Sequence, residues 1–356
     1  MDYPVIKIDW SLLIPLILLV SLGLLMLRSV APSQLMYQAI FALISAVVFA
    51  IFAYTDYRLF FSFHVPIYIA AILAMLLPYV FGAASRGAHR WLQFGQVFLQ
   101  PSEGVKPFLL ITFAILAASS IKYKQLWLVT AFALPALIIF LQPDLGTMLV
   151  LAIGWLTIFL PQIPRRLLLV GAIVVTLVSP VVWLSLRDYQ RDRLITFVDP
   201  YSDPLGKGYQ VIQSTIAVGS GQFWGRGLGQ GTQSQLRFLP EQHTDFMFAA
   251  LAEELGFVGA CLVIGLFIWI FIRIYVISQH APDLAANFFC LGVLAMLAFQ
   301  VFVNVGMNIG VAPVTGITLP FVSYGGSSLV SLAVTLGLVA GISHQSSTLK
   351  IVDSWV

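Results

Sequence analysis

The sequence predicts an all-α integral membrane protein, and three observations carry this prediction. Of the 356 residues, 60% are hydrophobic and only 9% are charged, whereas about a quarter of the residues of a soluble domain are charged. The hydrophobic residues gather in stretches of about 20, which is long enough to cross a hydrocarbon core of about 30 Å as a helix. A helix is favoured there because it satisfies its own backbone hydrogen bonds where water is absent.

We expect ten transmembrane helices in a single membrane domain covering residues 1–356, with a large extracytoplasmic loop at 187–245 between the seventh and the eighth. The expected spans are, in order, residues 9–28, 37–54, 62–82, 103–120, 126–142, 145–161, 166–186, 246–272, 285–310 and 325–343. The first is expected to be a retained helix, because its apolar run from Leu12 to Leu27 is longer than the apolar region of a typical signal peptide.

Basic residues in the short connections set the expected orientation. They fall near the two ends of the chain and in alternate connections, at Lys7, Arg58, Lys122, Lys124, Arg165, Arg166, Arg273 and Lys350. The positive-inside rule places these segments, and therefore both termini, in the cytoplasm. Cys261 and Cys290 both lie in expected spans, and neither their spacing nor any histidine pattern indicates a disulfide, zinc or haem. No motif indicates a nucleic-acid partner.

Asp245 stands where the large polar loop meets the eighth span. The same loop carries six basic residues, Arg187, Arg191, Arg193, Lys207, Arg226 and Arg237. A carboxylate at the membrane surface beneath such cations suits chemistry on a negatively charged, lipid-linked substrate. Two structural alternatives stay open: Asp245 could cap the eighth helix, and the cations could solvate the loop near lipid headgroups.

Other ionisable residues near membrane depth are candidates because charge is expensive there. Glu103 and Lys106 are three residues apart, so they can pair on one helix face; the alternative is a helix-capping arrangement with a local ion pair. Asp144 begins the sixth span and is either an N-cap or a catalytic or cation-binding group. Glu253 could share a face with Asp245 and look into the same cavity, or it could make a hydrogen-bonded contact between helices.

Two glycine-rich outer segments could contribute to the same cavity. Within the large loop, residues 209–218 have helical spacing of apolar side chains, which predicts a short amphipathic or re-entrant helix carrying Gln213. In the last outer connection, Ser323 and Tyr324 belong to a polar turn that could line the cavity or simply start the tenth span.

Several motifs together resemble the shape, elongation, division and sporulation family. They are GTQSQL at 231–236, LPEQHTDF at 239–246, AEELG at 252–256 and PFVSYGGS at 320–327, with QPSE at 100–103, QPDLGT at 142–147 and DPLG at 203–206. The resemblance spans nearly the whole chain, in order, and the 231–236 run is more similar to the elongation member than to the division member. Gly104 departs from the pattern, since a bulkier residue is expected there.

The resemblance implies a peptidoglycan glycosyltransferase of the bacterial cytoplasmic membrane that polymerises lipid II, with Asp245 as the catalytic aspartate. Asp245 would take the proton from the acceptor 4-hydroxyl. Arg193, with Arg187, Arg191 and Lys207 as lesser candidates, would bind the diphosphate, because the planar guanidinium can grip two oxygens at once. Mg²⁺ or Mn²⁺ could share that role. The other candidate substrate-binding residues are Glu103, Lys106, Asp144, Gln213, Ser323 and Tyr324.

The same resemblance implies partners. The chain shows no Ser-x-x-Lys acylation site accompanied by its supporting motifs, so cross-linking is expected from a class B penicillin-binding protein, alongside lipid II, the nascent glycan and other membrane proteins of the elongation complex. Small residues could admit the partner's helix, namely Gly256, Gly259 and Ala260 on the eighth span and Gly292 and Ala295 on the ninth. The alternatives are a lipid II flippase or transporter without catalysis, and a structural scaffold.

Overall fold

The computed structural model describes residues 9–85, 88–95, 97–164, 166, 168, 176–177, 184, 188–206, 208–236 and 238–353. Within them, eight helices are long and apolar enough to cross a membrane. These are α1 (Trp10–Val30), α2 (Pro32–Tyr54), α4 (His64–Phe81), α7 (Lys124–Leu141), α8 (Leu145–Phe159), α13 (Met247–Gln279), α14 (Leu284–Asn308) and α15 (Gly326–Asp353).

Shorter helices connect the long ones or lie at the ends of the bundle. They are α3 (Tyr57–Ser62), α5 (Pro101–Gly104), α6 (Lys106–Ala118), α10 (Asp188–Val198), α11 (Tyr209–Ser220) and α12 (Thr232–Gln235), with 3₁₀ turns η1 (Leu160–Gln162) and η2 (Pro200–Ser202). The helical membrane class is therefore confirmed. The expected seventh span, 166–186, lies almost wholly outside the described residues, so the number ten stays a prediction.

The expected fourth span is broken into α5 and α6. Pro107 has no N–H to donate to the carbonyl of Glu103 four residues earlier. The hydroxyl of Ser331 on α15 donates to that carbonyl instead, at 2.6 Å. The break leaves α6 with 13 residues and places the side chains of 100–106 beside α8 and α15.

A small sheet corrects the all-α prediction. Residues 83–99, expected to be a connection, form three antiparallel strands in the order β1 (Ala83–Ser85), β2 (Ala88–Phe94) and β3 (Val97–Leu99). Leu92 lies opposite Leu99, and Gly95 turns the chain with a φ of 63°, which glycine adopts without strain. The sheet leads directly into α5 and carries Arg90.

α14 and α15 are the most buried of the eight long helices, and α14 lies among α6, α8 and α13. In the apolar stretch of α14, 61% of the residues are buried, compared with 11% in α2. A Cβ added at Gly292 would lie 3.0 Å from Ile158 and 3.2 Å from Leu110. The small residue therefore permits close approach of helices inside the bundle, and it does not face outward as expected for a docking residue.

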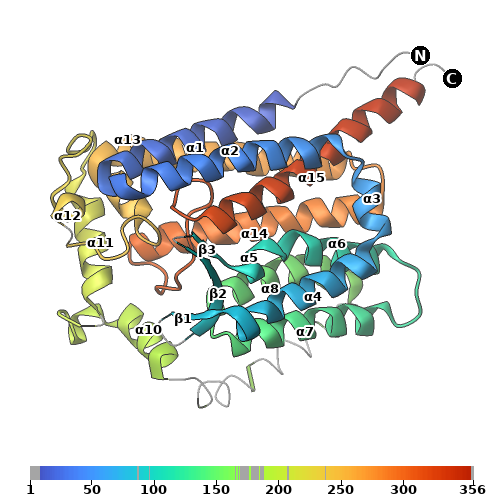
Figure 1. The fold of residues 1–356 in the computed structure, drawn as a ribbon, viewed down its shortest axis with the longest axis horizontal. Helices are drawn as coiled ribbons and strands as arrows, with labels where there is room; N and C mark the ends of the chain where they lie inside the picture. The colour runs from blue at the N-terminus through green and yellow to red at the C-terminus, as the bar shows by residue number, and fades with distance from the viewer. Residues whose placement is uncertain are drawn as a thin grey trace.

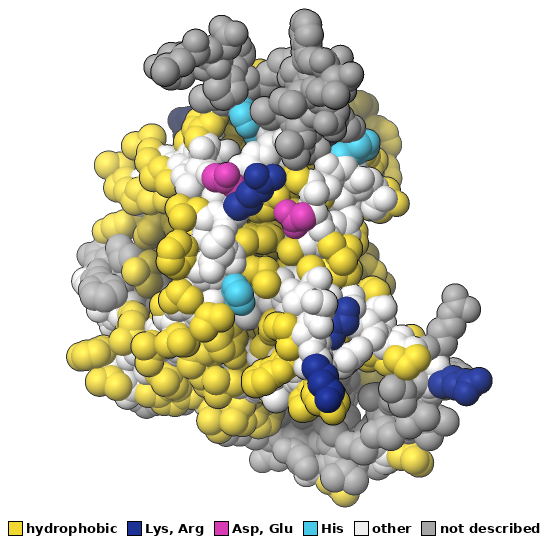
Figure 2. Space-filling model, turned by 90° about the vertical axis from the view of Figure 1, so that its right-hand side faces the viewer, with side chains coloured by type: hydrophobic (Ala, Val, Ile, Leu, Met, Phe, Trp, Pro, Cys, Tyr) yellow, Lys and Arg dark blue, Asp and Glu magenta, His cyan; other side chains and the backbone are white. Residues whose placement is uncertain are grey.

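The two ends of the bundle differ (Figure 1). α1 begins and α15 ends at the end where α3 lies, whereas α10, α11 and α12 gather at the opposite end. Figure 2 looks onto the α3 end and shows Lys and Arg side chains among hydrophobic ones; Arg58 and Lys122 are exposed. At the start of α1, Asp9 pairs with Arg273 of α13 at 2.7 Å and thereby ties the first span to the eighth.

A sharp interruption divides α13 at Gly256, where φ is 69° and ψ is −166°. The loop after α11 packs directly against this point. A Cβ at Gly256 would lie 2.2 Å from the backbone nitrogen of Gly225, and Phe257 N donates to Gln222 O at 2.8 Å. Two glycines therefore allow backbone to touch backbone, and the first part of α13 is held against the α11–α12 segment.

Candidate functional site

Asp245 closes a tight turn at residues 241–246, immediately before α13. The amides of Thr244 and Phe246 both donate to the carbonyl of Glu241, at 3.1 and 3.3 Å. Phe246, not Asp245, occupies the N-cap position of α13, which has no side-chain capping bond. The capping alternative is therefore wrong. The carboxylate is half-buried, and a Cβ added at Gly316 would lie 3.6 Å from its Oδ2.

Two asparagines hold this turn through its backbone. The side-chain nitrogens of Asn304 and Asn308, one helical turn apart on α14, donate to the carbonyl of Asp245 at 3.0 and 3.1 Å. Both asparagines are fully buried. Asn304 also donates to Ile317 O at 2.8 Å, and Asn308 Oδ1 accepts from Ala249 N at 3.0 Å. We call these two residues the asparagine pair; it fixes Asp245 without using its carboxylate.

Ser323 and Tyr324, which were expected either to line the cavity or to start the tenth span, lie beside the turn. The Ser323 hydroxyl donates to Thr244 O at 2.6 Å and accepts from Leu319 N at 3.0 Å. The amide of Tyr324 donates to His243 O at 2.8 Å. Burial lowers the pKa of the His243 imidazole, an effect that the charge of Glu241 partly offsets. This lower pKa favours the neutral form of the imidazole.

The structure describes two of the four predicted cations, Arg191 and Arg193. Arg193 is exposed on α10 and donates from Nη1 to Thr315 O at 3.1 Å, one residue from Gly316. Arg191 donates to the carbonyl of Leu184. Arg187 and Lys207 lie outside the described residues. Of the two candidate cations that the structure describes, Arg193 contacts the segment that borders Asp245.

The predicted helix at 209–218 is confirmed as α11, but its contact with the site is made by the residue after Gln213. Ser214, which is fully buried, donates to Asn308 O at 2.8 Å, while Gln213 is half-buried. Ser214 was missed because a serine within an amphipathic helix carries no distinctive signal.

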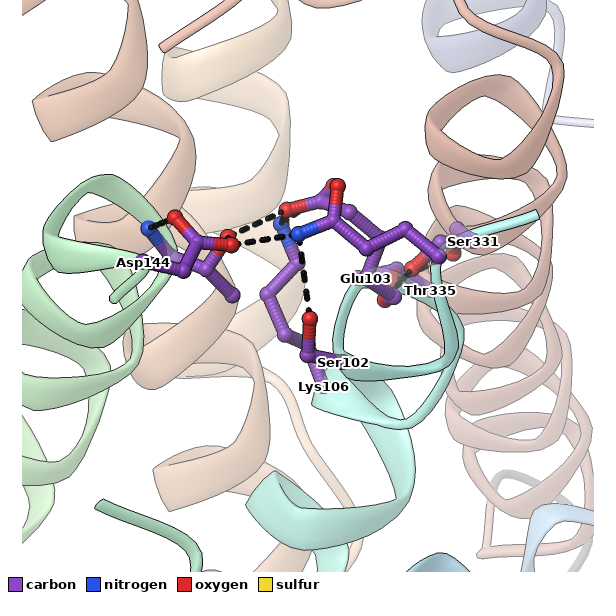
Figure 3. Close-up of polar contacts among 8 residues, drawn as sticks. Ser102, Glu103, Lys106, Asp144, Ser331 and Thr335 are labelled. Carbon is purple, nitrogen blue, oxygen red and sulfur yellow. Dashed lines mark hydrogen bonds and ion pairs between the residues drawn. The ribbon is translucent and has the colours of Figure 1, made fainter. Parts of the chain in front are cut away.

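A second polar cluster lies inside the bundle (Figure 3). Lys106 is 4% exposed, and its Nζ lies 2.8 Å from both oxygens of Glu103. The Thr147 hydroxyl lies 3.1 Å from Glu103 Oε1 and 2.8 Å from Asp144 Oδ2. Asp144 also accepts from Thr147 N at 3.2 Å and from the side chain of Gln100. The predicted pair and the predicted N-cap are both confirmed, and they form one network.

Arg90 joins this network from the sheet. Its Nη1 lies 3.9 Å from Asp144 Oδ1, and its guanidinium stacks over the ring of Trp91 at 5.8 Å. Sequence reasoning missed Arg90 because nothing indicated that residues 83–99 form a sheet. The sheet brings Arg90 to Asp144, the N-cap of α8.

The segment 315–317 lies between the two clusters. A Cβ at Gly146, two residues after Asp144, would lie 3.3 Å from Thr315 O and 3.0 Å from the side chain of Ile317. Gly316, which lies between Thr315 and Ile317 in the sequence, borders Asp245. The buried network and the Asp245 turn therefore share one stretch of backbone.

Glu253 takes the alternative considered for it, a hydrogen-bonded contact. Its carboxylate is fully buried and accepts from the amides of Gln233 at 2.8 Å and Ser234 at 3.0 Å, at the start of α12. Its neighbour Glu254 accepts from the Ser29 hydroxyl of α1 at 2.7 Å. Glu253 fastens the start of α12 to α13, and Glu254 fastens α13 to α1.

Metal-binding side chains are sparse in this region. Among the residues that the structure describes, no group of three or more His, Cys, Asp or Glu side chains could hold a metal ion. A cation such as Mg²⁺ would need most of its oxygen ligands from substrate and water.

Comparisons with known proteins agree with this arrangement. A family of cell cycle proteins comprising FtsW, RodA and SpoVE matches residues 5–348. The peptidoglycan glycosyltransferase MrdB of Escherichia coli strain K12 is 43% identical over 294 residues, or 80% of this chain and 79% of that protein. A chain of a solved peptidoglycan synthase complex that coordinates polymerization and crosslinking aligns with a TM-score of 0.82 at 35% identity, covering 96% of this chain and 98% of that one. The rod shape determining protein RodA of Thermus thermophilus aligns with a TM-score of 0.69 at 29% identity, covering 95% and 97%.

The Glu103–Lys106 pair generates a first prediction. Lys106→Ala and Glu103→Ala should each lower thermal stability in detergent, because each leaves a charge without its partner in a largely buried place. The double variant should lose less than the sum of the two, by about 0.5–3 kcal/mol. Additive losses in the melting curves would show that the two side chains do not interact.

A second prediction concerns Glu253. Glu253→Ala should destabilise the protein, because two amides lose their acceptor and each unsatisfied donor costs about 1–3 kcal/mol. Glu253→Gln keeps one acceptor oxygen and should lose less. The measurement is the melting temperature of each purified variant. Equal melting temperatures for the wild type and the alanine variant would contradict the fastening role.

Proposed function

The chain belongs to the FtsW, RodA and SpoVE family and is a peptidoglycan glycosyltransferase, and we propose that it polymerises lipid II with Asp245 as the general base. One observation carries this assignment. The asparagine pair holds the backbone carbonyl of Asp245, and the half-buried carboxylate is thereby presented at the outer ends of the spans, where a lipid headgroup lies.

A single base suffices for this reaction. As the acceptor 4-hydroxyl attacks the anomeric carbon of the donor, its proton passes to the Asp245 carboxylate. A new bond forms between the acceptor oxygen and that carbon, and the bond from the carbon to the diphosphate oxygen breaks on the opposite side, inverting the configuration. The diphosphate departs with the bonding electrons, so it needs nearby cations more than it needs a second carboxylate.

Arg193 is the best-placed of the predicted cations for the departing diphosphate. Its bond to Thr315 O ties α10 to the segment that borders Asp245, and a guanidinium can bind two phosphate oxygens. Arg187, Arg191 and Lys207 remain lesser candidates. A divalent cation, Mg²⁺ or Mn²⁺, could assist, held mainly by diphosphate oxygens and water.

The protein is a multi-pass protein of the bacterial inner membrane, and we place its termini in the cytoplasm. The α3 end carries exposed Arg58 and Lys122, which the positive-inside rule assigns to that side. Asp245 then faces outward, where the cell wall is built. Similarity to MrdB and RodA supports a role in cell elongation.

We propose a class B penicillin-binding protein as the cross-linking partner, supported by similarity to a chain of the synthase complex. Of the small residues expected to receive its helix, Gly256 and Gly292 pack internally. The outward face of α13 is a better candidate. It presents a continuous apolar stripe with 43–60% exposure, made of Phe257, Leu262, Ile268, Trp269 and Ile272.

A third prediction tests the base. Asp245→Asn should reduce lipid II polymerisation by purified protein in liposomes by about a hundredfold to ten-thousandfold, because an amide cannot accept the proton. The variant should remain folded, since the asparagine pair binds only the backbone. His243→Asn serves as the comparison and should retain far more activity. If the histidine variant were the inactive one, His243 would be the base. If lipid II crossed the bilayer but the wild type made no polymer, the flippase alternative would stand.

A fourth prediction tests the docking face. Cys261 is exposed on the α13 stripe, whereas Cys290 is buried. Labelling of Cys261 by a membrane-permeable maleimide should fall when the transpeptidase is co-expressed, and Cys290 should stay unlabelled in both preparations. Unchanged labelling of Cys261 in the purified complex would place the partner elsewhere.

A further inference from the structure

A half-enclosed groove of about 430 Å³ runs between α1, α2 and α15, which lie alongside one another in Figure 1. Its volume falls within the range of about 300–1,000 Å³ that is usual for ligand sites. It extends along α15 from Leu329 to His344, or about 22 Å at 1.5 Å per residue. A molecule lying in it would therefore cross most of a hydrocarbon core of about 30 Å.

The groove is apolar and open to the bilayer. Small side chains on α2, among them Ala42, Ala46 and Ala50, form one wall. Ile17 and Ser21 of α1 line the groove and are exposed, as is Ala46. The hydrocarbon chain of a lipid can therefore enter the groove sideways from the membrane, without passing through the protein.

A cation stands at the outer end of this groove. Arg28 lies seven residues after Ser21, which is two helical turns, so both point to the same side of α1. It is exposed in the last turn of the helix. An apolar track that ends below an arginine matches a prenyl chain attached to a diphosphate.

The outer end of the groove also adjoins the Asp245 turn. Gln242 donates to the carbonyl of Val30, two residues after Arg28, at 3.1 Å. Phe321 lines the groove, and Ser323, two residues later, binds Thr244 O. The groove therefore leads from the far end of the bundle to the two segments that contact residues 242–244.

We propose that this groove binds the prenyl chain of the acceptor lipid and that Arg28 binds the acceptor diphosphate; the inference rests on the proposed function. A polymerase must hold two lipid-linked diphosphates at once, and each requires an apolar track and a cation. Arg193, bonded to Thr315, serves the diphosphate that departs. Arg28, on a different segment, serves the diphosphate that stays attached.

The decisive experiment measures acceptor and donor separately. A lipid II analogue capped at the 4-hydroxyl can act only as donor. When this capped donor is in excess, the rate of single condensations in liposomes depends on the concentration of uncapped lipid II. That dependence gives the KM of lipid II as acceptor. Ala46→Trp, which fills the groove, should raise the acceptor KM by about tenfold or more, because each methylene kept out of an apolar site costs a factor of about four. The donor KM and kcat should change by less than about twofold, since only uniform binding is lost.

Two matched comparisons accompany this variant. Leu43→Trp lies on the same helix, is 70% exposed and does not line the groove, so it should behave as the wild type. Arg28→Gln should raise the acceptor KM, and Arg28→Lys should recover part of the loss. If Ala46→Trp matched Leu43→Trp, or if it raised the donor KM instead, the acceptor assignment would be overturned.

A binding measurement guards against misfolded variants. A photoreactive benzophenone side chain at position 46 should cross-link to radiolabelled lipid II. Unlabelled prenyl diphosphate, which displaces lipid II from the groove, should reduce this cross-linking, whereas cross-linking from the same group at position 43 should not change. Displacement by phosphatidylglycerol but not by prenyl diphosphate would make the groove a phospholipid site and refute the proposal. Displacement by prenyl diphosphate in a protein that makes no polymer would instead count against the proposed function alone.

Discussion

The bilayer offers no hydrogen bonds, and the arrangement of this protein depends on that constraint. A buried polar group there is stable only if it finds a partner within the chain. The side-chain amides of Asn304 and Asn308 donate to the carbonyls of Asp245 and Ile317. Two polar side chains that would destabilise α14 if they were unpaired therefore hold the turn in place. Glu103, Lys106 and Asp144 satisfy one another through Thr147. The same pairings that keep polar groups tolerable in the membrane also shape the end of the bundle that carries Asp245.

Much of the fold could be predicted because membrane helices leave a strong signal in composition and length. The eight long helices begin within five residues of their expected starts. All but α2 begin within two residues, inside the error of about 2–4 residues that is usual for such boundaries. Local pairings were also predictable: the spacing of Glu103 and Lys106, and the position of Asp144 before a span, follow from helix geometry alone. The motifs that carry the family resemblance pointed to the functional class.

The parts that could not be predicted depend on contacts distant in sequence. Whether Glu253 faces Asp245 or the amides of Gln233 and Ser234 is decided by where the loop folds back, and helical spacing cannot say. The small sheet needs a register between strands that are only three to seven residues long, too short for a clear alternation. The asparagine pair left one usable sign: Asn304 and Asn308 are four residues apart, so they share one face of a mainly apolar span.

The contact between Gly225 and Gly256 limits which sequences this fold can accept. Both residues have positive φ, and a Cβ on either would lie 2.6 Å or less from backbone atoms of the other's segment. No flexible side chain can move aside to make room. Substitution at either position must displace a whole loop, and a compensating change at the other cannot help, since glycine is already the smallest residue. We therefore expect no correlated substitutions at these two positions across related chains. Ordinary contacting pairs differ, because a larger residue at one position can be offset by a smaller residue at the other.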